Sequence, residues 1–146
     1  MKKYLLALFL LPLCAGLNGQ PTSASLSPLG VWRTTDDQTG EVKSHILIFE
    51  KDGKQFGQVI KVMRASLNHL CDKCEGVRKN QPVLGMVIIE DMVFRGGYWQ
   101  GGQVLFPKQG RWYPLKYWLM NGNPNRLVVR GFLGPFYRTQ FWDRVE

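Results

Sequence analysis

From residue 30 onward, hydrophobic and β-branched residues occur in short runs that are separated by glycine, proline, asparagine and aspartate. Runs of this kind, bounded by turn-forming residues, are typical of β-strands. No long stretch between them has the period of an amphipathic helix, which argues against parallel strands joined by helices. Eight strands are predicted, over residues 30–35, 41–50, 54–64, 84–93, 98–106, 111–120, 126–133 and 136–144.

Most connections between these runs are short, and they predict antiparallel hairpins. Asp52-Gly53 and Gly134-Pro135 are strong turn sequences, and the adjacent Asp36 and Asp37 are interpreted as turn formers. An open sheet of this many strands has unpaired edges, and closing it into a barrel removes them. We therefore predict an all-β domain, a small antiparallel up-and-down barrel of about eight strands. A barrel of this size is filled by side chains or holds one small ligand.

The alternation along the strands does not assign an inner and an outer face. In the sixth predicted strand, Tyr113, Leu115 and Tyr117 share one face, whereas Trp112 and Trp118 share the other. Both faces carry apolar residues, as expected if outward aromatic side chains pack under loops or against a partner.

The first 20 residues have the pattern of a cleavable secretory signal. Lys2 and Lys3 precede an apolar run at 4–13 that is too short to span a bilayer as a helix, and small and polar residues follow it. The alternative is a buried N-terminal helix. The predicted domain organisation is a signal peptide at 1–20, a flexible leader at 21–27 and a single barrel domain at 28–146.

Cys14 leaves a second kind of processing open, because a cysteine at the end of an apolar run is lipidated in some bacterial proteins. The residues before it, Pro12 and Leu13, are not the small residues that this processing prefers. We predict a periplasmic or extracellular location and no transmembrane span, with lipid anchoring at Cys14 as the alternative.

The formal net charge of +8 falls to +6 when the two signal lysines are removed. A basic balance favours nucleic acids or anionic surfaces as partners, but export argues against nucleic acid. The basic residues are scattered, with no block of five or more. They are interpreted as a solvated surface, with weak attraction to acidic glycans or lipid headgroups as the functional alternative.

One connection, at 65–83, is too long for a hairpin turn and contains Cys71 and Cys74. In an oxidising compartment two nearby cysteines usually form a disulfide, here worth about 2 kcal/mol because the enclosed loop is tiny. A redox pair and a metal site that includes His69 are the alternatives. The first lacks the expected βαβ context and the second offers three clear ligands instead of four. A disulfide is predicted, without a metal or a cofactor.

Several short motifs are spread along the predicted barrel. They are Gly30-Val31-Trp32, Cys71-Asp72-Lys73-Cys74, Tyr98-Trp99, Gly101-Gly102, Phe106-Pro107, Arg130-Gly131-Phe132-Leu133-Gly134, Arg138-Thr139-Gln140 and Trp142. In this order they resemble DUF2147, a family of exported bacterial proteins of unknown function. The resemblance implies a lipocalin-like barrel and an envelope location, and it implies no established activity.

A Gly-X-Trp on the first strand also resembles the opening motif of lipocalins, in which an arginine of the last strand covers the tryptophan ring. Here Trp32 would be covered by Arg144 or Arg138, with Trp142 nearby. A guanidinium stacked on tryptophan contributes roughly 0.5–2 kcal/mol. We interpret these four residues as a structural closure of one barrel end.

A small barrel cannot bury every aromatic residue of this chain, so some should line a mouth or an exposed patch. His45 is mid-strand, where it is either a wall residue or a titrating ligand contact. The predicted ligand-binding residues are His45, Tyr98, Trp99, Tyr117, Trp118 and Arg130.

The favoured interpretation is a non-catalytic protein of the bacterial envelope that binds a small apolar or amphipathic ligand in the barrel mouth, with the cysteine-containing loop as a rim or lid. The alternative is a filled barrel that docks to an envelope protein or glycan. An enzyme of unrecognised type is a third hypothesis, although no G-x-S-x-G or H-E-x-x-H motif occurs and no catalytic residue is predicted. A barrel cavity of roughly 300 Å³ or more would favour the first. The oligomeric state is left open.

Overall fold

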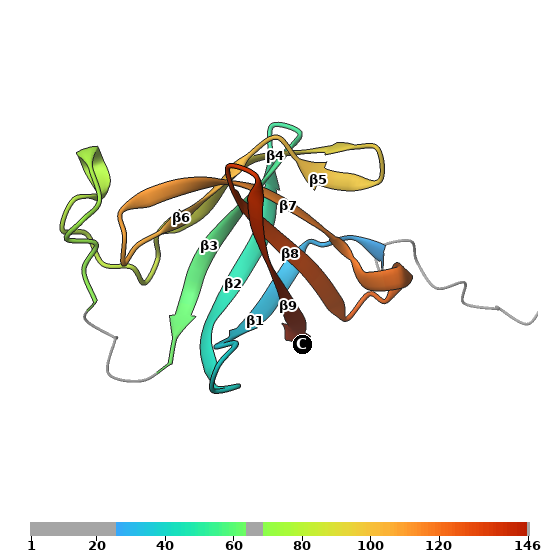
Figure 1. Cartoon of the computed structure of the whole chain (residues 1–146), viewed down its shortest axis with the longest axis horizontal. Helices are drawn as coiled ribbons and strands as arrows, with labels where there is room; N and C mark the ends of the chain where they lie inside the picture. The colour runs from blue at the N-terminus through green and yellow to red at the C-terminus, as the bar shows by residue number, and fades with distance from the viewer. Residues whose placement is uncertain (1–25, 64–68, 146) are drawn as a thin grey trace, which may run out of the picture.

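The computed structural model describes residues 26–63 and 69–145, which form a closed antiparallel β-barrel (Figure 1). The predicted signal peptide, Cys14 and most of the leader lie outside the described residues. The strands are β1 (Gly30–Thr35), β2 (Val42–Lys51), β3 (Lys54–Val62), β4 (Val87–Arg95), β5 (Tyr98–Gln100), β6 (Gln103–Phe106), β7 (Arg111–Leu119), β8 (Arg126–Leu133) and β9 (Phe136–Val145), with short 3-10 turns η3 (Gly76–Arg78) and η4 (Met120–Gly122).

The barrel closes because β9 pairs with β1, and β3 pairs with β4. Both β5 and β6 lie between β4 and β7, so they are the two halves of one strand, interrupted at Gly101 and Gly102. A Cβ atom on Gly102 would lie 2.0 Å from the carbonyl oxygen of Glu90, so the interruption requires glycine there. Counting β5 and β6 as one strand, the prediction of an eight-stranded antiparallel barrel is confirmed.

The structure also assigns the two faces of each strand. Leu115 and Tyr117 of β7 face the core, whereas Trp112 and Trp118 face outward. On β4 the inward positions change parity, because Asp91 has a φ of 59° and locally bulges the strand, so that both Ile89 and Met92 are buried. Sequence alternation alone does not locate such a bulge.

One end of the barrel is sealed by Trp32, which is fully buried. Its indole Nε1 donates a hydrogen bond to the carbonyl of Pro28 at 2.7 Å, and the Arg144 guanidinium carbon lies 4.3 Å from the ring centroid. Arg144 also donates to the backbone carbonyls of Ser27, Leu29 and Pro124. This guanidinium therefore joins the first and last strands and the turn before β8.

One residue assigned to this closure from sequence, Arg138, lies elsewhere, which corrects that part of the assignment. Arg138 pairs with Gly131 near the far end of the β8–β9 hairpin, whereas Arg144 of the same strand pairs with Trp32. Trp142 is buried in the same core cluster as Trp32, and its indole Nε1 donates to Oε1 of Gln140. The register of β9 on β1 decides this, and sequence alone does not give the register.

Near the sealed end, the core contains one buried polar pair. The Tyr117 hydroxyl donates to Oε1 of Gln55 at 2.8 Å, and both side chains are fully buried. The Gln55 amide nitrogen has no hydrogen-bond partner among the described residues. Burial raises the pKa of the Tyr117 phenol well above its usual value.

Tyr117→Phe is expected to destabilise the barrel by about 1–2 kcal/mol, because it leaves a second polar atom of Gln55 buried without a partner. The double variant Gln55→Met/Tyr117→Phe should recover most of that loss, since it removes every polar atom of the pair. Urea unfolding followed by circular dichroism measures both. A double variant less stable than Tyr117→Phe would contradict this account of the pair.

The predicted disulfide between Cys71 and Cys74 is confirmed. Both cysteines are buried, in a small cluster with Met86 and Leu105 against which Trp112 packs. Leu105 and Trp112 point away from the barrel interior, so the segment 69–86 packs against the outer face of β6 and β7. Figure 1 shows this green segment at the side of the barrel. Val83 of the same segment also packs against the main core of the barrel. The hypothesis of a rim or lid over the barrel mouth stays a prediction, because residues 64–68 of this connection lie outside the described residues.

Candidate functional site

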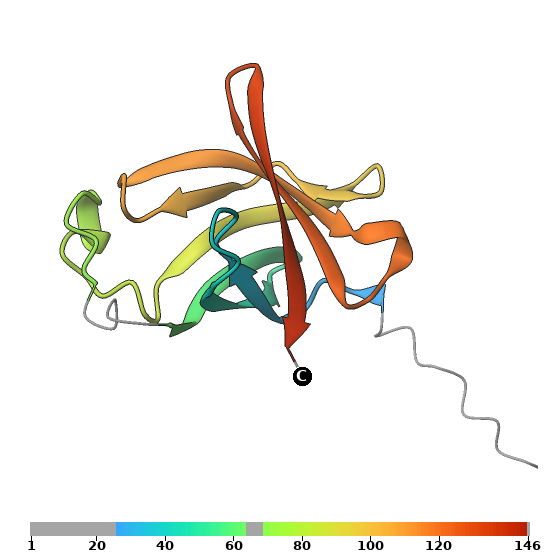
Figure 2. The same cartoon turned by 60° about the horizontal axis from the view of Figure 1, so that its bottom comes forward.

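The β8–β9 hairpin leaves the barrel wall at the end opposite Trp32. The pairing of β9 with β1 covers only Asp143 to Val145, whereas β8 and β9 stay paired up to Leu133 and Phe136. Figure 2 shows the tip of this hairpin projecting beyond the other strands. The departing hairpin therefore leaves the barrel open at this end.

Beneath the hairpin lies a pocket of about 320 Å³, called here the mouth pocket. It is lined by residues of β6 to β9 and of the turn between β6 and β7. The lining residues are Val104, Phe106, Gln109, Tyr113, Leu115, Val129, Gly131, Phe132, Leu133, Phe136, Tyr137, Arg138, Gln140 and Trp142. Leu115, Val129 and Trp142 also belong to the core, so the pocket floor is the top of the packed core.

Alternation along β8 and β9 explains which side chains reach the mouth pocket. Val129 and Gly131 lie on the inner face of β8, and Arg138, Gln140 and Trp142 lie on the inner face of β9. A Cβ atom on Gly131 would meet no atom within 4 Å. The missing side chain at this position therefore contributes directly to the pocket volume.

Arg138 is the one charged residue among those that line the mouth pocket. Its Nε and Nη2 donate to the same carboxylate oxygen, Oδ2 of Asp37, at 2.9 and 2.5 Å. Nε2 of Gln140 donates to that oxygen at 3.4 Å. Asp37 belongs to the β1–β2 loop, so this contact spans the side where β9 no longer pairs with β1.

The neighbouring Asp36 has a different structural role, which agrees with its interpretation as a turn former. Its Oδ1 accepts the backbone N–H groups of Gln38 and Thr39, and its Oδ2 lies 2.5 Å from the Lys43 ammonium. The Lys43 hydrogen bond, followed by these backbone bonds, holds the pKa of the Asp36 carboxyl far below its usual value. Asp36 thus fixes the loop, and the Asp37 carboxylate is directed to Arg138.

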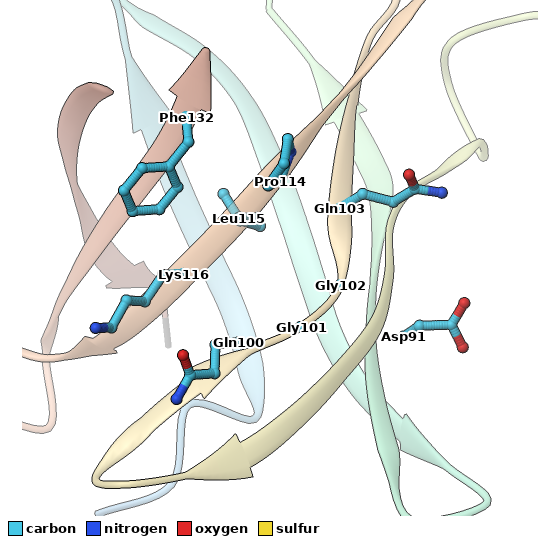
Figure 3. Close-up of a pocket in the computed structure, with 9 residues that line it drawn as sticks. All are labelled: Asp91, Gln100, Gly101, Gly102, Gln103, Pro114, Leu115, Lys116 and Phe132. Carbon is cyan, nitrogen blue, oxygen red and sulfur yellow. The ribbon is translucent and has the colours of Figure 1, made fainter. Parts of the chain in front are cut away.

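A second hollow, of about 610 Å³, lies on the outer surface where β5 gives way to β6. Figure 3 shows that its charged side chains, Asp91 and Lys116, point in opposite directions. Its floor includes Gly101 and Gly102 at the interruption of the strand. The hollow is larger than the mouth pocket, but its polar groups do not converge on a common point, so we favour the mouth pocket as the binding site.

Three of the residues predicted to bind a ligand lie together on the outer surface. The Lys116 ammonium lies 3.6 Å from the ring centroid of Tyr98, which packs edge-on against Trp118. The Arg130 guanidinium lies over the rings of Trp118 and Tyr137, at 5.3 and 4.4 Å. On the outer surface, the Lys116 and Arg130 side chains thus lie over the faces of neighbouring aromatic rings.

The other three predicted residues are dispersed. Trp99 packs against the core and Tyr117 lies within it. His45 is half-buried on the outer wall, where desolvation, followed by the charges of Lys61 and Arg33, lowers the pKa of its imidazole. None of the six predicted residues is among those that line the mouth pocket.

The sequence interpretation missed Gly131, Phe136 and Gln140, and gave Arg138 another role. A usable signal was present, because Gly134-Pro135 marks a tight turn between two confirmed strands. Alternation on either side of that turn places Gly131 with Leu133 and Arg138 with Gln140 on common faces. What alternation does not show is which of the two faces is the inner one.

The described residues, 26–63 and 69–145, also bear on metal and membrane sites. No group of three His, Cys, Asp or Glu side chains there is arranged to hold a metal ion. The same residues contain no helix with the length and apolar character needed to cross a membrane.

Comparisons with known proteins agree with this architecture. A family model described as "Uncharacterized protein conserved in bacteria (DUF2147)" matches residues 30–144. The chain belongs to the DUF2147 family. A solved structure, protein HP1028 from Helicobacter pylori, is described as belonging to the lipocalin family, and it superposes on this DUF2147 protein with a TM-score of 0.70. The two share 17% identity over 83% of this chain and 84% of the other, which shows a common lipocalin-like fold. The comparison with curated proteins gave no match.

Proposed function

We propose that this DUF2147 protein is a non-catalytic protein of the bacterial envelope that binds a small apolar or amphipathic ligand in the mouth pocket. The observation that carries the proposal is an open pocket of about 320 Å³ at the mouth of the barrel, lined mainly by apolar and aromatic side chains. Small-molecule sites typically enclose about 300–1,000 Å³ and have a few polar groups that orient the ligand. The mouth pocket therefore suits a ligand at the small end of this range.

The two ends of the barrel support this proposal in different ways. Trp32 and Arg144 seal one end, and the core between the ends is packed with side chains such as Ile46, Ile89 and Leu127. A ligand would therefore enter at the hairpin end and rest on the core. The Cys71–Cys74 disulfide supports the proposed export, because disulfides persist in oxidising compartments.

A docking module for an envelope protein or glycan is the second candidate. It is favoured by the outer array of Tyr98, Lys116, Trp118 and Arg130, since aromatic and basic side chains are common at binding surfaces. In this array, however, the cations already cover the ring faces. The apolar walls of the mouth pocket, apart from the Tyr137 ring, are not covered by cations of the described residues in this way, so ligand binding is the better supported function.

Filling the mouth pocket tests the proposal. Gly131→Leu places a side chain in open space at an ordinary backbone conformation. It is expected to weaken binding of the neutral apolar probe N-phenylnaphthylamine by about tenfold or more, a loss of about 1.4 kcal/mol, measured by fluorescence titration. Lys61→Leu, which adds the same side chain to the exposed outer wall, is the control.

The control variant should bind the probe as the unaltered protein does, and the unfolding midpoint of each variant shows whether it is folded. A folded Gly131→Leu variant that binds the probe with unchanged affinity would refute ligand binding in the mouth pocket. Loss of binding in both variants would locate the probe site elsewhere on the surface.

A further inference from the structure

Three N–H donors at the mouth pocket converge on one oxygen atom. They are Nε and Nη2 of Arg138 and Nε2 of Gln140, and the oxygen they share is Oδ2 of Asp37. Both donor side chains line the mouth pocket, whereas Asp37 comes from the β1–β2 loop outside it. The donors belong to the pocket, and the acceptor is supplied from another part of the chain.

We infer that Arg138 and Gln140 form a cradle for the anionic headgroup of the ligand, and that the Asp37 carboxylate competes with the ligand for this cradle. The inference rests on the proposed function and narrows it to amphipathic molecules that carry an oxyanion, such as a carboxylate. The apolar part would lie against the pocket walls, where Val129 and Trp142 form part of the floor.

The chemistry of the donors selects an anion. A guanidinium presents its N–H groups in a planar fork that matches a carboxylate, and such charge-assisted hydrogen bonds are stronger than neutral ones. No carboxylate side chain is among the residues that line the mouth pocket, and its remaining polar side-chain groups belong to Gln109, Tyr113, Tyr137 and the indole of Trp142. A neutral or cationic headgroup would leave Arg138 without a comparable partner within the pocket.

The Asp37 carboxylate is suited to be displaced from Arg138 by such a ligand. The loop that carries it is held by Asp36, through Gln38, Thr39 and Lys43, so the loop keeps its anchor when the Asp37 side chain moves. The Arg138–Asp37 pair is solvent-accessible, with side chains 63% and 36% exposed, and exposed ion pairs contribute little free energy. An incoming carboxylate would replace this pair and also bury an apolar chain, which an isolated anion cannot do.

The inference is tested with three amphiphiles of equal chain length: decanoate, decanol and decyltrimethylammonium. Each competes with N-phenylnaphthylamine for the unaltered protein, below the concentration at which it forms micelles. Decanoate is expected to compete about tenfold more strongly than decanol, and decyltrimethylammonium more weakly than either. Equal competition by decanoate and decanol would overturn the inference.

Two variants then identify the side chain that causes the preference for decanoate. Arg138→Gln is expected to remove most of the preference for decanoate over decanol, because only decanoate accepts charge-assisted hydrogen bonds from the guanidinium. Arg126→Gln removes the same charge from the outer face at the sealed end of β8 and should keep the preference. An unchanged preference in Arg138→Gln, or an equal loss of preference in Arg126→Gln, would refute a headgroup site at Arg138.

Asp37→Asn separates competition from structural support. If Asp37 competes with the ligand, this variant binds decanoate about threefold more tightly, because an amide is a weaker partner for Arg138, and decanol is unaffected. If the Asp37 contact only supports the pocket, decanoate and decanol lose affinity together, which would overturn the competition.

These outcomes are distinct from failure of the proposed function. If Gly131→Leu leaves N-phenylnaphthylamine and decanol binding unchanged, the mouth pocket is not a ligand site at all. If Gly131→Leu abolishes both but the headgroup makes no difference, the pocket binds a ligand and the anion cradle is wrong.

Discussion

Trp32→Ala is expected to destabilise the barrel by about 3–5 kcal/mol, the usual cost of removing a fully buried large aromatic side chain. The indole is inaccessible to solvent, donates to the Pro28 carbonyl and is covered by the Arg144 guanidinium. Without the ring, Arg144 loses the surface on which it stacks, and the sealed end of the barrel contains a cavity. Urea unfolding followed by far-UV circular dichroism measures the loss of stability.

Trp118→Ala is the matched control, because it removes the same side chain from the outer wall, where the ring is half-exposed. Its ring contacts Tyr98 and Arg130, and its loss is expected to cost about 1–2 kcal/mol. Equal destabilisation by the two substitutions would contradict the assignment of Trp32 as the residue that seals the barrel.

The strands were predictable where turn residues mark both ends. The predicted strand 126–133 coincides with β8, since Pro124 precedes it and Gly134-Pro135 follows it. The predicted strand 84–93 is displaced, because β4 begins only at Val87. Gly85 instead occupies a turn in which its N–H donates to the Val59 carbonyl, a tertiary contact that no local sequence pattern reveals.

The candidate site was less predictable, and the reason lies in β9. Its alternating residues were evident, but its register on β1 ends at Asp143, so the upper half of the strand leaves the wall. That departure creates the mouth pocket and places Arg138 beside it instead of over Trp32. Outward aromatic residues such as Tyr98 and Trp118 added to the difficulty, since cations cover them and make the outer face as aromatic as the inner one.

The β8–β9 hairpin thus serves two purposes along its length. Near Arg144 it is held on both sides, by β1 and by three backbone carbonyls. Near Phe136, which is 73% exposed, β9 no longer pairs with β1, and the hairpin is joined to the β1–β2 loop through the contacts of Arg138 and Gln140 with Asp37. Segments with few buried contacts open locally at low free energy. We therefore expect the same two strands to be rigid at the sealed end and to open more easily at the mouth pocket.

Gly110→Ala is expected to cost about 3 kcal/mol or more and to detach the disulfide segment from the barrel wall. Gly110 lies in the turn between β6 and β7 with a φ of 65°, and a Cβ atom there would lie 1.8 Å from the carbonyl oxygen of Lys73. That atom is backbone, next to Cys74, and it cannot rotate away as a flexible side chain would. The backbone at Lys73 and Cys74 must therefore move away from the β6–β7 turn to admit a single methyl group.

Gly122→Ala separates the effect of the clash with Lys73 from the effect of backbone strain. Gly122 has a similar φ of 70°, but a Cβ atom there meets nothing within 4 Å, so alanine should cost only about 1–2 kcal/mol. Hydrogen exchange supplies the local measurement, because the Cys71 and Val83 N–H groups donate to carbonyls within the segment. Their protection should fall in Gly110→Ala and persist in Gly122→Ala. Equal exchange in the two variants would mean that close contact with this turn does not hold the disulfide segment in place.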